Sequence, residues 1–471
     1  MRIAIISTYT HPTRLRVKER SIMQSSVPEL IAALCPEDAE IELYNEKEGD
    51  IPLDRHWDLV FFSYLHSFYE HTKVLSALFR RRGMTTVAGG RHASQFPDDC
   101  LRHFDCVVTG EPEANVPALV SDFQRGVMER IYDRPSQGPA SIRPYRYDLI
   151  DYRTNAIRLP GIEASRGCPF TCNFCVLTGK EQYRFRPVRD VVEEIEHKMT
   201  WNPNLLGLFD ASFVFLDNNL GGNPRYLREL CEALVPLGKI WGCALTFNIL
   251  ENPELIRLMA KAGCRYIYTG LESLNPASIQ AMNKRQNRLG ELRRVLRHTY
   301  SSGIILSFGM IVGADGDTSE YLEKLPEYLA DIDCQCITYL GMVCPYPGTP
   351  FHQQLVREGR LLPGTISRDY DGYTLCHRPS HLEVSEVVDH YKRLSRSLSS
   401  FTSVVHHYWS KLWLSDQPRY LRSILVSGRE IASVRNPCDN RERTFIGGQD
   451  PLEAWDAKMM GELGLEPQRL S

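Results

Sequence analysis

The chain has 471 residues, of which 43% are hydrophobic and 24% charged, with a formal net charge of −3. The length predicts two or three domains, and the composition is that of a soluble globular enzyme. The charge gives no indication of a nucleic-acid partner, no apolar run reaches the roughly 18 residues of a membrane span, and the first apolar run is too short for a signal peptide. We therefore expect a cytoplasmic protein without a membrane span.

Short apolar runs alternate with helical periodicity over residues 1–133. The predicted strands are Ile3–Ser7, Ile41–Tyr44, Leu59–Ser63, Thr86–Ala88 and Cys106–Thr109, and the predicted helices are Val27–Leu34, Thr72–Arg82 and Val116–Arg125. This alternation is typical of a doubly wound, Rossmann-like α/β domain, in which ligands bind at the carboxyl ends of parallel strands. The polar or glycine residues expected at those ends are Thr8, Ser63, His66, Gly89, Gly90, Gly110 and Glu111.

A segment rich in proline, serine and arginine suggests a linker over residues 134–155, before a second α/β region at 156–352. The predicted strands there are Ile157–Ala164, Phe213–Leu216, Trp241–Thr246, Tyr266–Gly270, Ile304–Val312 and Cys336–Met342. The predicted helices are Val191–Thr200, Pro224–Leu234, Pro253–Ala262, Leu289–Ser301 and Ser319–Leu329. Six β/α units predict a partial (β/α)6 barrel with its chemistry at the carboxyl ends of the strands.

The remainder, residues 353–471, is predicted to be a mostly helical accessory region. Tyr339, Tyr346, Asp371 and Tyr373 are candidates to border the cavity, and each has plain packing as its alternative. No residue is predicted to be catalytic, and the last 70 residues match no known pattern.

Of the 14 cysteines, only Cys168, Cys172 and Cys175 have the spacing of metal ligands. They follow the first predicted barrel strand, and three thiolates on one loop can bind three irons of a cubane and leave the fourth iron open. The alternative is a zinc site, which needs a fourth ligand and more often uses a shorter spacing. No such ligand lies nearby in the sequence, which favours the [4Fe–4S] cluster.

The segment Ser165–Cys175 resembles the signature of the radical S-adenosylmethionine (SAM) superfamily. Four later segments resemble further motifs of that family in the same order, namely Asp217–Asn219, Gly270–Ser273, Gly309–Gly313 and Tyr346–Pro350. The resemblance implies a cluster bound by the three cysteines. It also implies SAM contacts from Phe174, Asn219, Glu272, Ser273 and Val312.

The first region resembles the cobalamin-binding domain that precedes the barrel in one radical SAM class, through Gly89–His92 and Asp105–Glu113. The resemblance implies a cobalamin site at the strand-end residues given above. The Asp-x-His-x-x-Gly motif that supplies a histidine ligand elsewhere is absent. Tyr64 and His66 stand where relatives carry smaller residues, so three readings stay open: they cover the lower face of cobalamin, His66 binds cobalt, or they fill the pocket.

The resemblance implies a radical SAM methyltransferase of a biosynthetic pathway. It would act on a small-molecule, lipid or natural-product substrate and take electrons from a reductant such as flavodoxin or ferredoxin. Radical cyclisation, rearrangement or transfer of the aminocarboxypropyl group of SAM are alternatives on the same fold. A non-catalytic sensor of SAM or cobalamin is an alternative of another class.

Overall fold

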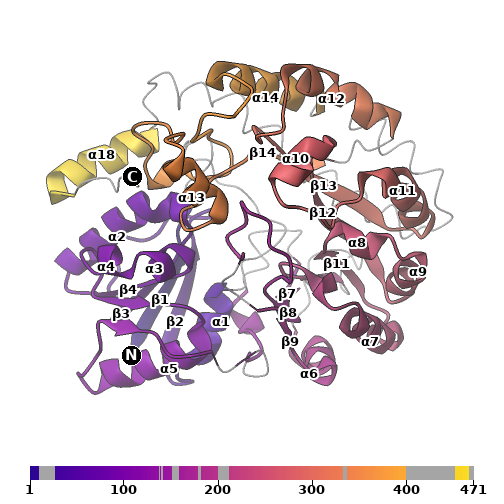
Figure 1. Cartoon of the computed structure of the whole chain (residues 1–471). Coiled ribbons are helices and arrows are strands. Elements are labelled where there is room, and N and C mark those ends of the chain that lie inside the picture. Colours follow the sequence, from indigo (N-terminus) through magenta and orange to yellow (C-terminus); the bar gives the residue numbers. More distant parts are fainter. Residues whose placement is uncertain are drawn as a thin grey trace.

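Two parallel sheets of six strands each form the framework of the protein (Figure 1). The computed structural model describes residues 1–465 except 10–26, 137, 139–141, 151–158, 179–181, 200–211, 333–336 and 399–450. Within this part of the chain, no helix is both long and apolar enough to cross a membrane.

The first sheet has the order β2-β1-β3-β4-β5-β6, and every pair of neighbours is parallel. Its strands are β1 (Arg2–Ser7), β2 (Glu40–Asn45), β3 (Leu59–Ser63), β4 (Thr85–Gly89), β5 (Cys106–Val108) and β6 (Ile131–Tyr132). The helices around it are α1 (Val27–Leu34), α2 (Tyr69–Arg81), α3 (Arg91–Gln95), α4 (Pro97–Cys100) and α5 (Pro112–Gln124). The strand order changes direction between β1 and β3, which is where doubly wound sheets bind ligands. The predicted doubly wound domain is confirmed.

Alternate residues of the central strands enter two separate cores, because successive side chains of a strand point to opposite faces. Ile3 and Ile5 of β1 pack in one core, whereas Ala4 and Ile6 pack in the other. A sheet covered by helices on both faces has few polar positions left, so its polar groups gather at the strand ends.

The second sheet has the order β14-β13-β12-β11-β10-β7 and is also parallel throughout. Its strands are β7 (Gly161–Ile162), β10 (Ser212–Phe215), β11 (Ile240–Ala244), β12 (Cys264–Glu272), β13 (Ile305–Val312) and β14 (Ile337–Met342). The helices that cover it include α6 (Val188–Glu193), α7 (Pro224–Leu234), α8 (Phe247–Leu250), α9 (Pro253–Lys261), α10 (Pro276–Ala281), α11 (Leu292–Ser301) and α12 (Ser319–Asp331). The strands follow one another in chain order, as in an open partial barrel, and the predicted barrel is confirmed.

The strand predicted over 157–164 is observed only as β7, and its first two residues lie outside the described part of the chain. A short antiparallel pair that the sequence did not predict follows it, formed by β8 (Ser165–Arg166) and β9 (Arg184–Phe185). The cysteine loop lies between these two strands. This pair therefore fixes both ends of the loop.

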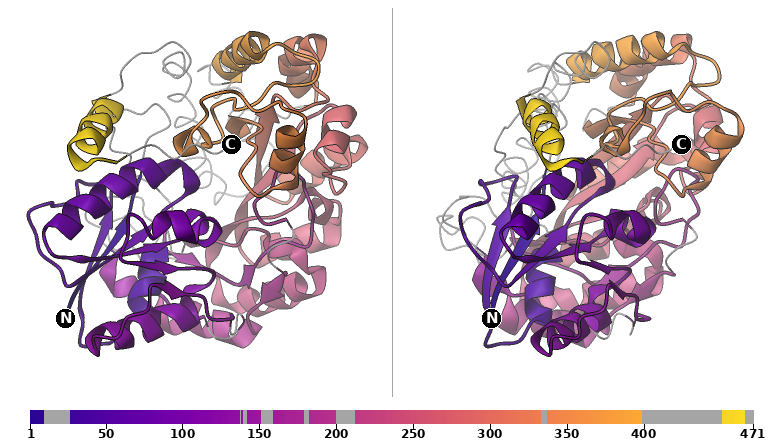
Figure 2. Two further views of the ribbon diagram at one scale, coloured as in Figure 1. Left: turned by 60° about the vertical axis from the view of Figure 1, so that its left-hand side comes forward. Right: turned by 90° about the vertical axis from the view of Figure 1, so that its left-hand side faces the viewer.

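The described part of the region after the barrel is mostly helical, as predicted, with α13 (Pro350–Arg357), α14 (Val384–Leu398) and α18 (Pro451–Leu463). Helix α14 packs on α12, and α18 lies against α2 of the first domain (Figure 2). The 3₁₀ turn Ser367–Asp369 contacts the 3₁₀ turn His66–Phe68, and Ser367 Oγ donates to Glu70 Oε1 at 2.6 Å. The C-terminal region thus touches both sheet domains.

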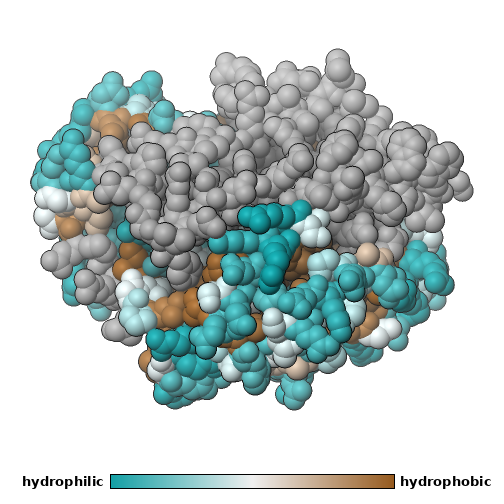
Figure 3. All heavy atoms as spheres, turned by 90° about the horizontal axis from the view of Figure 1, so that it is seen from above, coloured by the Kyte–Doolittle hydropathy of each residue, from teal (hydrophilic) through white to brown (hydrophobic). Residues whose placement is uncertain are grey.

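The face seen in Figure 3 carries hydrophilic side chains over most of its described surface, with hydrophobic atoms in smaller groups between them. Such a surface is ordinary for a globular enzyme, because single exposed apolar residues need no partner.

Candidate functional site

The loop that carries the three cysteines is braced by the segment that follows α10. Asn173 donates from its backbone to the carbonyl of Met282 at 3.1 Å and from its side chain to the carbonyl of Ala281 at 2.6 Å. In return, the Asn283 side chain donates to the carbonyl of Thr171 at 2.8 Å. These bonds join residues more than 100 positions apart. They fix the loop against the segment that follows α10.

Two amide side chains donate to the thiols of this loop. Asn219 Nδ2 lies 3.5 Å from Cys168 Sγ, and Gln286 Nε2 lies 3.3 Å from Cys172 Sγ. Asn219 is fully buried, and its oxygen accepts from the backbone of Thr246 at 3.2 Å. The amide orientation is therefore set, and its N–H₂ group points to sulfur. Hydrogen bonds to sulfur help to set the potential of an iron–sulfur cluster.

Burial raises the pKa of the Cys172 and Cys175 thiols, and the ammonium of Lys284 lowers it in part. A metal or cluster would bind the thiolate form. Within the described residues, no three His, Cys, Asp or Glu side chains converge on a position for a single metal ion. A cubane needs less convergence, because each thiolate binds a different iron.

The carboxyl end of β12 contributes a buried ion pair next to the thiols. Glu272 and Lys284 are 8% and 7% exposed, and their carboxylate and ammonium groups are in direct contact. Glu272 has a φ of 66°, a left-handed conformation that is strained for a residue with a side chain. Burial opposes the charged form of Lys284, but Glu272 and the two neighbouring thiols outweigh it and raise the pKa of the lysine.

The other residues predicted to bind SAM lie around this pair. Phe174 packs in a small core between α10 and α13, and the ammonium of Lys284 lies 5.9 Å from its ring centre. Ser273 Oγ is 2.9 Å from the hydroxyl of Tyr321, and Val312 ends β13 in the barrel core. Ser273 and Val312 thus lie at the carboxyl ends of the adjacent strands β12 and β13, and their contact with SAM stays a prediction.

Asp217 precedes Asn219 and holds the entry to the cysteine loop. Its carboxylate accepts from the backbone of Ala164 at 3.1 Å and from the hydroxyl of Ser165 at 2.5 Å. Burial raises the pKa of this carboxyl to about 7, although both hydrogen bonds lower it. The predicted motif Asp217–Asn219 is therefore built into the loop through two different side chains.

The residues predicted to bind cobalamin divide into accessible and buried groups. Gly110 is exposed with a φ of 68°, and an added Cβ would meet no atom within 4 Å. Gly90 has a φ of 97°, and a Cβ there would lie 2.8 Å from the carbonyl oxygen of Tyr64. Ser63 and Gly89 end the adjacent strands β3 and β4 in half-buried positions, whereas Thr8 is buried with its hydroxyl 2.7 Å from that of Thr72.

Tyr64 and His66 are both buried. Tyr64 stacks between Tyr69 and Phe104 within the core of the first domain. His66 Nδ1 lies 2.6 Å from His92 Nδ1, and its Nε2 has no hydrogen-bond partner. Burial lowers the pKa of His66 to about 3 and that of His92 to about 2, so both rings are neutral at pH 7. The residue between them, Leu65, is 58% exposed.

Glu111, predicted to bind cobalamin, takes part in a charge network between the two domains. Its carboxylate contacts the guanidinium of Arg184 and lies 3.6 Å from that of Arg166. Arg166 also pairs with Glu113 at 2.7 Å and with Glu163 at 2.6 Å. Arg166 is two positions before Cys168, so this network places the carboxyl end of β5 beside the cysteine loop.

The candidate cavity residues of the later segments are mostly engaged within the protein. The hydroxyl of Tyr339 donates to the carbonyl of Gly372 at 3.1 Å, and its ring packs against Tyr373. The Asp371 carboxylate accepts from the backbone of Tyr373 at 2.7 Å, and Tyr346 is half-buried against a small cluster of Cys344, Tyr370 and Cys376. These contacts agree with the packing alternative.

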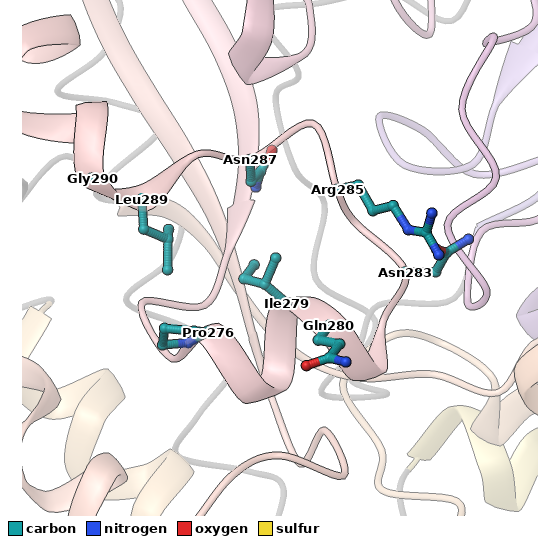
Figure 4. Close-up of a pocket in the computed structure, with 8 residues that line it drawn as sticks. All are labelled: Pro276, Ile279, Gln280, Asn283, Arg285, Asn287, Leu289 and Gly290. Atoms are coloured by element: carbon teal, nitrogen blue, oxygen red, sulfur yellow. The ribbon is translucent and has the colours of Figure 1, made fainter.

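A pocket of about 600 Å³ lies between α10 and the segment that precedes α11 (Figure 4). Asn283 and Arg285 lie at one end of it, and Leu289 and Gly290 lie at the other. None of the residues that line it belongs to the predicted site, and it meets the cysteine loop only through Asn283, which donates to the carbonyl of Thr171. We therefore do not assign it as the substrate cavity.

Sequence reasoning missed Lys284, Gln286, Arg166 and Arg184. Each lies in a loop or short strand without periodicity, and its role depends on a partner elsewhere in the chain. The one local signal was the polar run Asn283–Asn287 after a short helix, directly following the Gly270–Ser273 motif.

Comparisons with known proteins agree with this geometry. A model of the radical SAM superfamily matches residues 162–329. The bacteriochlorophyllide d C-12(1)-methyltransferase of Chlorobaculum tepidum is 25% identical over 391 residues, which cover 81% of this chain and 84% of that protein. The bacteriochlorophyllide d C-8(2)-methyltransferase of the same organism is 27% identical over 413 residues, which cover 84% of this chain and 89% of that protein.

Among solved structures, the chain resembles the cobalamin-dependent S-adenosylmethionine radical enzyme OxsB with aqua-cobalamin and S-adenosylmethionine bound. The match has a TM-score of 0.63 at 13% identity and covers 98% of this chain and 75% of that chain. At this identity the match shows a shared fold over almost the whole chain.

Proposed function

We propose that this chain, which is a radical SAM enzyme, methylates a carbon atom of a small-molecule, lipid or natural-product substrate with cobalamin as the methyl carrier. Its radical SAM domain implies a [4Fe–4S] cluster and SAM, and the similar methyltransferases favour methyl transfer. We propose Cys168, Cys172 and Cys175 as the cluster ligands. An external one-electron donor such as flavodoxin or ferredoxin would reduce the cluster.

The observation that carries the proposal is the charge network at Glu111. It brings the carboxyl edge of the first sheet next to Arg166 at the start of the cysteine loop. A ligand on that edge would therefore face the cluster site. When bound, the reduced cluster supplies the electron that splits SAM, and cobalamin supplies the methyl group.

The residues present at this edge fit a corrin ring. Leu65 is an exposed apolar side chain at the end of β3, and an apolar contact suits the face of a macrocycle. Gly110 has a positive φ, and the space where a side chain would stand is open, so the backbone there can lie close to a ligand. His66 Nε2 is a buried polar atom without a partner, which a cofactor side chain or a water would satisfy.

The role of this chain's own residues would be to orient and enclose. Asn219 and Gln286 would stabilise charge on the cysteine sulfurs that bind the cluster, and Tyr64 packs within the core of the first domain. His66 Nδ1 lies against His92, which leaves the unpartnered Nε2 as the ring nitrogen that could bind cobalt or a side chain of the corrinoid.

The first test is retention of a corrinoid by the full chain. The protein would be reconstituted anaerobically with iron, sulfide and hydroxocobalamin, desalted, and examined by visible spectroscopy. Leu65→Asp should lose most of the bound corrinoid, because a carboxylate would replace the apolar contact. Val127 is a matched control, since it is also 58% exposed but precedes β6 at the opposite edge of the parallel sheet.

Equal retention of the corrinoid by Leu65→Asp, Val127→Asp and the wild type, or no retention by any of them, would remove cobalamin from the proposal.

The second test identifies the products formed from SAM after the cluster is reduced. 5′-Deoxyadenosine together with S-adenosylhomocysteine supports methyl transfer, whereas methylthioadenosine indicates transfer of the aminocarboxypropyl group.

A further inference from the structure

The segments around the exposed part of the cysteine loop contain no acidic residue. Residues 164–180 carry the three cysteines, residues 273–290 include α10, and residues 338–357 run from β14 through α13. None of the three segments contains Asp or Glu, although the chain has 58 acidic residues among 471 and a net charge of −3. We refer to the exposed residues of these segments as the acid-free face.

Asn173 joins the three segments to one another. Its backbone donates to the carbonyl of Met282 at 3.1 Å, and its own carbonyl accepts from the backbone of Phe351 at 3.0 Å. Met282 and Phe351 also pack in the same small core. Asn173 lies between Cys172 and Cys175 in the sequence, so the segments of the acid-free face meet beside the thiols.

Two exposed arginines of the acid-free face have no ion pair or side-chain hydrogen bond with any described residue. Arg285 follows α10, and Arg357 ends α13. The other described lysines and arginines of these segments are engaged in ion pairs, namely Arg166 with Glu113, Lys284 with Glu272 and Arg288 with Glu251. Arg285 and Arg357 can therefore bind carboxylates from outside the chain.

The surroundings of the two arginines suit contact with a protein. The pocket of about 600 Å³ in Figure 4 has Asn283 and Arg285 at one end. Asn283 donates to the carbonyl of Thr171 and so connects this pocket to the cysteine loop. Val356, beside Arg357, is an apolar side chain that is 46% exposed. Arginine, amide groups and single apolar residues are common in protein–protein interfaces.

The cysteine loop itself reaches the acid-free face. Pro169 and Thr171 are exposed, and they adjoin Cys168 and Cys172 in the sequence. Electrons pass between redox groups at useful rates only over short distances, so a donor protein has to lie against the surface close to the cluster. A donor on the acid-free face would be one residue away from two of the proposed cluster ligands.

We propose that the acid-free face docks a small acidic electron-transfer protein, which delivers one electron to the cluster. This proposal rests on the cluster of the proposed function. With flavodoxin as the donor, the anionic flavin hydroquinone would become the neutral semiquinone and the cluster would change from [4Fe–4S]²⁺ to [4Fe–4S]⁺. No proton or further reactant is needed. Carboxylates of the donor would meet Arg285 and Arg357 and no acidic residue of these segments, and such complementarity speeds association and selects the partner.

The first measurement is the binding of fluorescently labelled flavodoxin to the full chain, reconstituted anaerobically with its cluster. Fluorescence anisotropy would give the affinity at low and high salt. Arg285→Glu and Arg357→Glu should each weaken binding roughly tenfold at low salt, because each places a carboxylate against an acidic partner. These differences should shrink at high salt, which screens exposed charges. Arg285→Lys should keep most of the affinity, since it keeps the charge.

Lys261 provides a matched control. It is exposed at the end of α9, shortly before β12 begins, so it lies at the amino ends of the barrel strands and away from the cysteine loop. Lys261→Glu changes the net charge by the same amount as the two arginine variants. It should leave flavodoxin binding within about twofold of the wild type.

The second measurement is the rate of cluster reduction, followed by stopped-flow absorbance. Arg285→Glu and Arg357→Glu should slow reduction by flavodoxin hydroquinone, but they should not slow reduction by the methyl viologen radical, a small cation that needs no docking surface. Wild-type flavodoxin binding in both variants, or binding to the wild type that does not depend on salt, would overturn the proposal. A reconstituted chain without iron and sulfide would instead overturn the cluster of the proposed function, and this proposal with it.

Discussion

At the scale of single residues, two amide side chains donate hydrogen bonds to thiols of the cysteine loop and would stabilise negative charge on their sulfurs. Asn219 follows β10 and Gln286 follows α10, yet each places its amide nitrogen within 3.5 Å of a thiol of the loop. Reduction of a cluster adds negative charge that spreads to its sulfurs. An N–H donor stabilises this charge and so raises the reduction potential.

Replacement of Gln286 by leucine should therefore make the potential of the cluster more negative, by tens of millivolts for one hydrogen bond of about 1 kcal/mol. An anaerobic redox titration followed by electron paramagnetic resonance measures this shift. Gln280 is an exposed glutamine six positions earlier, and Gln280→Leu should leave the potential unchanged. An unchanged potential in Gln286→Leu would mean that the amide does not bond to the cluster.

At the scale of secondary-structure elements, the buried His71 joins α2 to α18 and to the segment after β2. His71 of α2 lies 2.7 Å from Glu46, which follows β2, and 2.8 Å from Asp456 of α18. Burial opposes a charge on the ring, but the two carboxylates outweigh it and raise the pKa of His71 to about 10. The docking of α18 on α2 therefore depends on a protonated histidine.

The pKa of His71 in the folded chain lies above its ordinary value of about 6.5. The stabilisation of the folded state by protonated His71 is therefore complete below pH 6.5, and it is lost as the pH rises through about 10. The melting temperature of the wild type should fall between pH 7 and pH 10, and His71→Gln should show a flatter dependence. His381 is an exposed histidine, and His381→Gln should keep the wild-type slope. A chain shortened before residue 451 that still shows the full slope would contradict this assignment.

At the scale of the whole molecule, ion pairs between the two domains hold the two sheets in their relative positions. Arg166 and Arg184 flank the cysteine loop, and Glu111 and Glu113 follow β5 of the other domain. On another side, Ser367 binds Glu70 and ties the C-terminal region to α2. The first domain is therefore joined to the segment around the cysteine loop on one side and to the C-terminal region on another.

If Glu111 serves mainly to join the domains, Glu111→Gln and Arg184→Gln should have the same effect. Each should lower the free energy of unfolding by about 1 kcal/mol, and the double variant should lose little more, because both remove one partly exposed ion pair. Chemical denaturation of the three variants measures this coupling. Additive losses would show that Glu111 acts elsewhere, for example on a cofactor.

The order of elements could be predicted from the sequence because it depends on local periodicity. Val27–Leu34, Leu59–Ser63 and Pro224–Leu234 were predicted with the bounds that the structure shows. The pair of β8 and β9 was missed, since strands of two residues have no period to detect.

The sequence by itself determined the position of the three cysteines on a loop after the first barrel strand, because a spacing of eight residues is fixed by the covalent chain. Only the tertiary structure decided what surrounds them. Lys284 and Gln286 reach the loop from more than 100 positions away, and Tyr64 turns into the core rather than toward a ligand. Such contacts depend on how two sheets and their connecting loops pack, which no local pattern records.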